Sequence, residues 1–166
     1  MILITGIISI SNVLAQNNTN QSSSGQNQSG QSQKFVSTLT AQNVVPSVQD
    51  SKAKGLAEFN LNPQMNEIDY KVSVRDIDNV LNAVIQTGTA GTNGPIVVYL
   101  FRADTPTGQI NGELASETIE SNEFEGPMEG QTIQDFVNAI NNGNLYVSIT
   151  TAEYPNGEIR GTISPS

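Results

Sequence analysis

Residues 68–75 read Ile-Asp-Tyr-Lys-Val-Ser-Val-Arg, with apolar and polar side chains in strict alternation. In an extended chain Ile68, Tyr70, Val72 and Val74 share one face, and the polar side chains share the other. This alternation is typical of a strand that buries one face and exposes the other to water. The segment therefore predicts a half-buried antiparallel β-strand.

Comparable strand patterns occur along the rest of the chain, separated by turns rich in Gly, Pro and Asn. They lie at residues 35–39, 56–61, 80–87, 96–101, 110–119, 145–150 and 158–163. Asn156-Gly157, between the last two segments, is the strongest hairpin signal. About eight strands at this spacing predict an all-β domain, in the form of an antiparallel β-sandwich.

One segment near residues 132–142 breaks this series of strands. Thr132 and Asp135 have the spacing of a capping box, and Gly143 marks an end. Between them, apolar residues recur at helical spacing. These are Ile133, Phe136, Val137 and Ile140. We expect one short helix with a structural role, packed across an open end or face of the sheet.

The composition excludes several classes of function. Seven Lys and Arg stand against sixteen Asp and Glu, which gives the chain a net charge of -9. Such a protein is repelled by phosphate backbones, so nucleic acid is not an expected partner. The sequence contains neither Cys nor His, and therefore lacks thiolate nucleophiles, the commonest metal ligand and the commonest general base. No cofactor is expected.

The first 15 residues, Met-Ile-Leu-Ile-Thr-Gly-Ile-Ile-Ser-Ile-Ser-Asn-Val-Leu-Ala, are apolar and end in a small residue. This pattern predicts a signal peptide cleaved after Ala15. The basic residues that usually open such a peptide are missing, so an uncleaved N-terminal anchor is the alternative. The segment is shorter than a membrane-spanning helix, and no second apolar run follows. We expect a secreted or cell-surface protein with no other membrane attachment.

Residues 16–33 contain only Gln, Asn, Ser, Thr and Gly. A segment with no apolar side chains cannot offset the entropy lost on ordering, and therefore predicts a disordered linker. It holds Asn-x-Ser/Thr sequons at Asn17, Asn20 and Asn27, which are candidates for N-glycosylation. The folded domain is predicted to occupy residues 34–166.

Three regions of the predicted domain resemble the CHRD (chordin-type) domain, in the same order and with the same spacing. Residues 146–163 look like the family's ending, a Tyr-Val strand followed by Tyr-Pro-x-Gly-Glu-Ile-Arg-Gly. Residues 83–88 and 91–95 are similar to its Ala-His-Ile-His-x-Gly and Gly-x-Asn-Gly-Pro, and residues 42–46 resemble Asn-Glu-Val-Pro-Pro. The residues matched to these motifs are Pro46, Gly88, Gly91, Asn93, Gly94, Pro95, Tyr146, Tyr154, Pro155, Gly157, Glu158, Arg160 and Gly161.

The resemblance implies an immunoglobulin-like or superoxide-dismutase-like sandwich in an extracellular protein, and the animal members bind protein ligands. Family members often carry His where this chain has Val84, Gln86 and Thr150. Positions 84 and 86 share a strand face, so three His there would have the geometry of a metal site. The residues present are poor ligands for a transition metal, and we expect these positions to serve packing.

Carboxylates offer the remaining candidates for a site. Asp76 and Asp78, beside Asn79, and the run of glutamates from Glu117 to Glu129 could supply oxygen ligands for Ca²⁺. The alternative is a solvated acidic edge. Glu158 and Arg160 are expected to form a surface pair or a cross-strand ladder.

Two classes of function remain after these exclusions. The first is an exported, non-enzymatic module that binds a protein or a surface polysaccharide. The second is a Ca²⁺-binding or metal-dependent extracellular protein, or a hydrolase, that uses acidic oxygen ligands.

Overall fold

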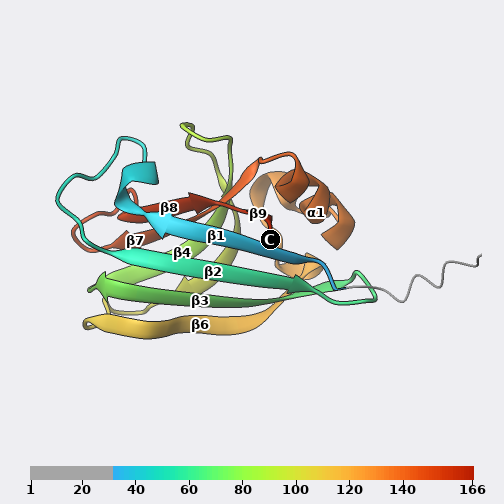
Figure 1. Ribbon diagram of the computed structural model, residues 1–166. Coiled ribbons are helices and arrows are strands. Elements are labelled where there is room, and N and C mark those ends of the chain that lie inside the picture. The colour runs from blue at the N-terminus through green and yellow to red at the C-terminus, as the bar shows by residue number, and fades with distance from the viewer. Residues whose placement is uncertain (1–31) are drawn as a thin grey trace, which may run out of the picture.

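The computed structural model describes residues 32–166 (Figure 1). The predicted signal peptide, all but the last two residues of the predicted linker, and the three sequons lie outside these residues. The strands are β1 (Lys34–Thr40), β2 (Lys54–Leu61), β3 (Glu67–Ile77), β4 (Val80–Thr87), β5 (Ile96–Arg102), β6 (Ile110–Glu120), β7 (Leu145–Thr151), β8 (Ile159–Thr162) and β9 (Ser164–Pro165). All eight predicted strands are therefore present, and β9 is an addition.

The strands form one antiparallel sheet in the order β5-β4-β7-β8-β1-β2-β3-β6, with β9 paired to β1. The sheet curls so that β5 and β6, at its two ends, contact each other. The all-β prediction is confirmed, but the two-sheet immunoglobulin-like sandwich is not. The shape is that of a nearly closed barrel. The pairing of β8 with β1 joins the strands β5-β4-β7-β8 to the strands β1-β2-β3-β6 in one continuous sheet.

The alternation that defines residues 68–75 places its apolar side chains in the core. Ile68, Tyr70, Val72 and Val74 are all buried, whereas Asp69 and Lys71 are exposed. The curled sheet encloses a single hydrophobic cluster, to which β3, β4 and β7 all contribute.

One α-helix, α1 (Ile133–Asn141), lies at one end of the sheet near β9 (Figure 1). Thr132 and Asp135 form the predicted capping box, and the four predicted apolar residues are buried. Phe136 stacks on Phe124 with 5.2 Å between ring centroids. The predicted helix is confirmed, and it lies at an end of the sheet, one of the two predicted placements; its structural role stays a prediction. No helix in residues 32–166 has the length and apolar character needed to cross a membrane.

Three short 3₁₀ helices complete the described elements, η1 (Ala41–Asn43), η2 (Ser121–Glu123) and η3 (Gly126–Met128). η1 opens the loop that joins β1 to β2. Its C-cap, Val44, is buried, and the peptide bond between Val45 and Pro46 is cis. This loop forms one wall of the site described below.

Candidate functional site

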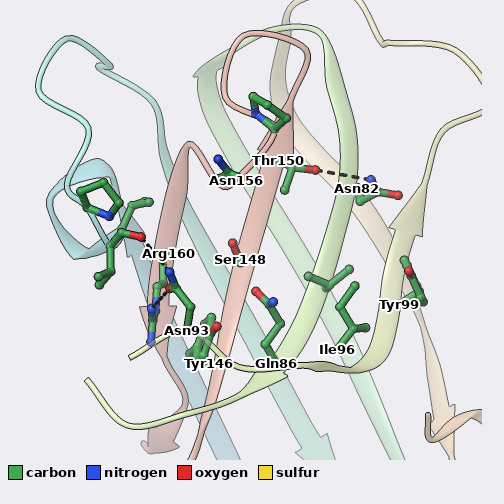
Figure 2. Close-up of a pocket in the computed structure, with 15 residues that line it drawn as sticks. Asn82, Gln86, Asn93, Ile96, Tyr99, Tyr146, Ser148, Thr150, Asn156 and Arg160 are labelled. Carbon is green, nitrogen blue, oxygen red and sulfur yellow. Dashed lines mark hydrogen bonds between the residues drawn. The ribbon is translucent and has the colours of Figure 1, made fainter. Parts of the chain in front are cut away.

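A hollow of about 440 Å³ lies on the outer face of β4, β7 and β8 (Figure 2). It is the outer face because the alternate residues Ala83, Ile85, Val147 and Ile149 belong to the core. We call this cavity the β4–β7 hollow. Its lining from the strands is Asn82, Val84, Gln86, Ile96, Tyr99, Tyr146, Ser148, Thr150 and Arg160, and from the loops Val44, Val45, Pro46, Asn93, Pro155 and Asn156.

A second cavity of about 450 Å³ lies on the other side of Arg160. We call it the β8–β1 hollow. Its lining is Val36, Thr38, Gln42, Asn43, Val44, Val45, Ala90, Gly91, Arg160, Thr162 and Ser164. The two hollows therefore share Arg160 and two residues of the β1–β2 loop.

The three positions singled out in β4 and β7 all face the β4–β7 hollow. Val84 is buried, while Gln86 and Thr150 are half-buried. The Gln86 amide donates a hydrogen bond to the carbonyl of Gly94 at 2.8 Å, and the Asn82 amide contacts the Thr150 hydroxyl at 3.4 Å. The three positions therefore lie on one face of β4 and β7 and line the same cavity, and their role in packing stays a prediction.

Arg160 is the cation of this face, and its side chain is only 3 % exposed. Its guanidinium lies 3.4 Å from the ring centroid of Tyr146 and donates to the carbonyls of Thr89 and Thr92 and to the Asn93 side-chain oxygen. Burial lowers the pKa of Arg160 from its usual value, and interaction with Tyr146 opposes this shift. Within residues 32–166, no carboxylate lies within ion-pair distance of this guanidinium.

Asn93 joins the two loops that border the hollows. Its side-chain oxygen accepts from Arg160 at 3.0 Å, and its amide donates to the carbonyl of Val45 at 2.8 Å. The backbone N–H of Gly94 donates to the Tyr146 hydroxyl at 3.1 Å. Asn93 and Gly94 of the 88–95 loop are therefore linked to Arg160 of β8 and Tyr146 of β7.

Glu158 does not form the predicted pair with Arg160. It is 8 % exposed, and its two carboxylate oxygens accept hydrogen bonds from Ser51 at 2.6 Å and Thr151 at 2.8 Å. The prediction of a surface pair was wrong because both side chains are buried, and each is satisfied by a separate set of partners.

Two motif glycines sit where no larger residue fits. A Cβ on Gly161 would lie 2.2 Å from the carbonyl oxygen of Thr38, and a Cβ on Gly94 would lie 1.9 Å from that of Thr87. Gly161 thus permits the close approach of β8 to β1. The remaining motif residues shape the turns. Pro95 accepts a hydrogen bond from Thr87, Tyr154 accepts one from Gly157, and Pro46 and Pro155 line the β4–β7 hollow.

The family model of the CHRD domain matches residues 35–163, from the second residue of β1 to the residue before β9. The chain belongs to the CHRD domain family. No curated protein and no solved structure matches the chain. The motif residues Gly88 and Gly91 lie in the β4–β5 loop of this CHRD domain, and Gly91 lines the β8–β1 hollow.

The acidic candidates of this CHRD domain lie away from both hollows. Asp76 and Asp78 are exposed where β3 passes into β4, and Asp76 has a φ of 54°. The glutamates from Glu117 to Glu129 are also exposed. No group of three or more acidic side chains within residues 32–166 is arranged to hold a metal ion. Residues 32–166 therefore contain no assembled site for calcium.

Several lining residues of the β4–β7 hollow were not predicted from the sequence. Asn82 and Ser148 lie two positions before Val84 and Thr150, so strand alternation could have placed both on the same face. Tyr99 faces the hollow after a register shift between β4 and β5, and the sequence carries no clear signal for that shift.

Proposed function

We propose that this CHRD-domain protein is an exported, non-enzymatic module that binds a surface polysaccharide in the β4–β7 hollow. One observation carries the proposal, namely the polar lining of that cavity. Asn82, Gln86, Ser148 and Thr150 offer amide and hydroxyl groups that can both donate and accept hydrogen bonds, as sugar hydroxyls do. Arg102 covers one face of the Tyr99 ring, and the other face offers an apolar surface on which a sugar ring can lie.

The size of the β4–β7 hollow suits this ligand. About 440 Å³ falls within the range of small-ligand sites, roughly 300–1,000 Å³. Most sites for apolar ligands are lined by hydrophobic and aromatic side chains with few polar groups. The amide and hydroxyl groups of this hollow favour a ligand that carries many hydroxyls.

Absence of turnover is part of the proposal. Hydrolysis of a glycosidic bond requires, in most enzymes, two carboxyl groups on either side of the bond. The lining residues of the β4–β7 hollow all belong to the described part of the chain, and none is Asp or Glu. CHRD domains are in general non-catalytic modules. Incubation with a bound polysaccharide should therefore release no new reducing ends.

Export is supported by the sequence of residues 1–15. N-terminal sequencing of the protein recovered outside the cell should begin at Gln16. Recovery of the whole protein inside the cell, with Met1 retained, would contradict export.

Binding is tested with the full chain and a panel of immobilised neutral and acidic polysaccharides. The double variant Asn82→Ala with Thr150→Ala removes two polar groups from the floor of the hollow. Their mutual contact of 3.4 Å is long, so the fold should lose little stability. Thr118→Ala, which removes an exposed hydrogen bond to Asp69 on the far part of the sheet, is the matched control.

The expected result is that the double variant binds at least tenfold more weakly than the control. Equal binding by the double variant and the control would show that the β4–β7 hollow is not the site. If the chain instead bound a surface protein and no polysaccharide, and the double variant lost that binding, the ligand of the hollow would be a protein.

A further inference from the structure

The β4–β7 hollow and the β8–β1 hollow are adjacent and share part of their lining. Val44, Val45 and Arg160 line both. The strands beneath them are neighbours in the order β4-β7-β8-β1. Since neighbouring strands lie about 4.8 Å apart, the two hollows together extend over about 14 Å of the sheet. Such a length exceeds one sugar ring and suits consecutive residues of a linear polymer.

The lining of the two hollows is positively charged, whereas the protein as a whole is negatively charged. The chain has a net charge of -9, yet neither hollow is lined by Asp or Glu. Polar uncharged side chains line the β8–β1 hollow as well, among them Gln42, Asn43 and Thr162. The one charged side chain in both linings is Arg160.

The positive charge of Arg160 has no anionic partner in the described residues. Its hydrogen bonds go to two carbonyls and one amide oxygen, which stabilise the cation but do not neutralise it. Glu158, two residues away, is held by Ser51 and Thr151 and lines neither hollow. Arg102, which lies over the ring of Tyr99 at 3.6 Å from its centroid, lines neither hollow and borders a separate cavity with Glu117, Glu123 and Glu125. A buried, unneutralised cation attracts an anion strongly because little water screens it.

We infer that the two hollows form one continuous site for a linear anionic polysaccharide, with an acidic group of the polymer placed near Arg160. The inference rests on the proposed function, to which it adds the charge of the ligand and the length of the site. The group that the site recognises is an anionic substituent of a sugar, either a carboxylate or a sulfate. General attraction cannot explain such binding, because the net charge of -9 repels polyanions.

The test uses the full chain with three polymers of matched length, namely polygalacturonate, dextran sulfate and neutral dextran. Two isosteric variants each add one carboxylate to one hollow. Asn82→Asp places it in the β4–β7 hollow and Gln42→Glu in the β8–β1 hollow, and neither residue bonds to Arg160. Gln134→Glu makes the same charge change on the exposed side of α1 and serves as the control.

Polygalacturonate, dextran sulfate or both should bind at least tenfold more tightly than dextran, and the preference should weaken as salt is raised. Each of Asn82→Asp and Gln42→Glu should weaken binding of the preferred polymer about tenfold through charge repulsion, while Gln134→Glu leaves it unchanged. Comparison of the two anionic polymers identifies carboxylate or sulfate as the recognised group.

Three outcomes would overturn the inference. The first is equal affinity for dextran and the anionic polymers, with dextran binding lost in the Asn82→Ala and Thr150→Ala variant. This result would refute a preference for anionic ligands but would still support polysaccharide binding in the β4–β7 hollow. An effect of Asn82→Asp without any effect of Gln42→Glu would confine the site to one hollow. If no polysaccharide binding depends on either hollow, the proposed function fails together with the inference.

Discussion

The guanidinium of Arg160 lies 3.4 Å from the centroid of the Tyr146 ring, on the outer face of two paired strands. β7 carries Tyr146 and β8 carries Arg160, and their side chains lie diagonally across the ladder. The ring covers one face of the cation, and carbonyl and amide oxygens surround its edge. Arg160 therefore ties β8 to the loop that contains Thr89, Thr92 and Asn93, without any ion pair.

Replacement of Arg160 by Lys should destabilise the protein although the charge is kept. A lysine ammonium cannot reproduce the planar fork that reaches three oxygens and stacks on Tyr146. The expected loss in the free energy of unfolding is about 2 kcal/mol, measured by urea denaturation. Arg102→Lys is the matched control, since Arg102 also stacks on a tyrosine but is exposed. A loss no larger than that of the control would show that the oxygens around Arg160 contribute little.

Alanine at Gly161 should destabilise the domain far more than alanine at Gly91. The new Cβ at position 161 would lie 2.2 Å from a backbone oxygen of β1, so the two strands would have to separate. Gly91 has a φ of 85° but open space around it, so its substitution costs about 1 kcal/mol of backbone strain. Thermal unfolding of the two variants should show a midpoint lowered by several degrees more for Gly161→Ala. Equal midpoints would contradict the close approach of β8 to β1.

The elements of this fold could be predicted from the sequence because each carries a local signal. Alternation identifies the strand that contains Tyr70, and the capping box with four spaced apolar residues identifies α1. The closure of the sheet could not be predicted in the same way. It depends on the pairing of β8 with β1, between Thr40 and Arg160, and no local pattern encodes a contact at that separation.

The candidate site was predictable only in part. Strand alternation placed Val84 and Gln86 on one face, and the family resemblance added Thr150 and the motif residues around Arg160. The hollow itself was not predicted, because it exists only when the β1–β2 loop folds over the sheet. A hydrogen bond between Asn93 and Val45, 48 residues apart, holds that loop in place.

Calcium should give little stabilisation to this protein. Asp76 and Asp78 are exposed, and the described residues hold no group of three acidic side chains around one point, whereas Ca²⁺ takes six to eight oxygen ligands. Thermal unfolding in chelator and in millimolar Ca²⁺ should give the same midpoint. A ligand at about 100 times its dissociation constant adds about 2.7 kcal/mol, which would be visible. A calcium-dependent rise that disappears on changing both residues to Asn would establish the acidic site instead.

Stability should fall between pH 10 and 12 because of Tyr70. Burial, together with the charges of Glu117 and Glu123, raises the pKa of Tyr70 from 10.0 to about 12. Its hydroxyl donates a hydrogen bond to the carbonyl of Leu100 at 2.6 Å, which only the protonated form can do. In this pH range the unfolded chain loses the proton and the folded chain keeps it, so the unfolded state is favoured as pH rises.

The stabilisation by Tyr70 is thus present in full below pH 10 and lost as pH rises through 12, with an amplitude of about 2 kcal/mol. Urea denaturation at several pH values measures it. Tyr70→Phe should be less stable than the wild type at pH 8, because the Leu100 carbonyl loses its donor, and should approach the wild type near pH 12. Val72→Ala, on the same face of β3, should lower stability by a similar amount at every pH, because it removes core packing and no proton. The contrary result is a constant difference in the free energy of unfolding between Tyr70→Phe and the wild type across this pH range. It would show that the Tyr70 hydroxyl has the same pKa in the folded and unfolded states, so that its hydrogen bond to Leu100 does not raise that pKa.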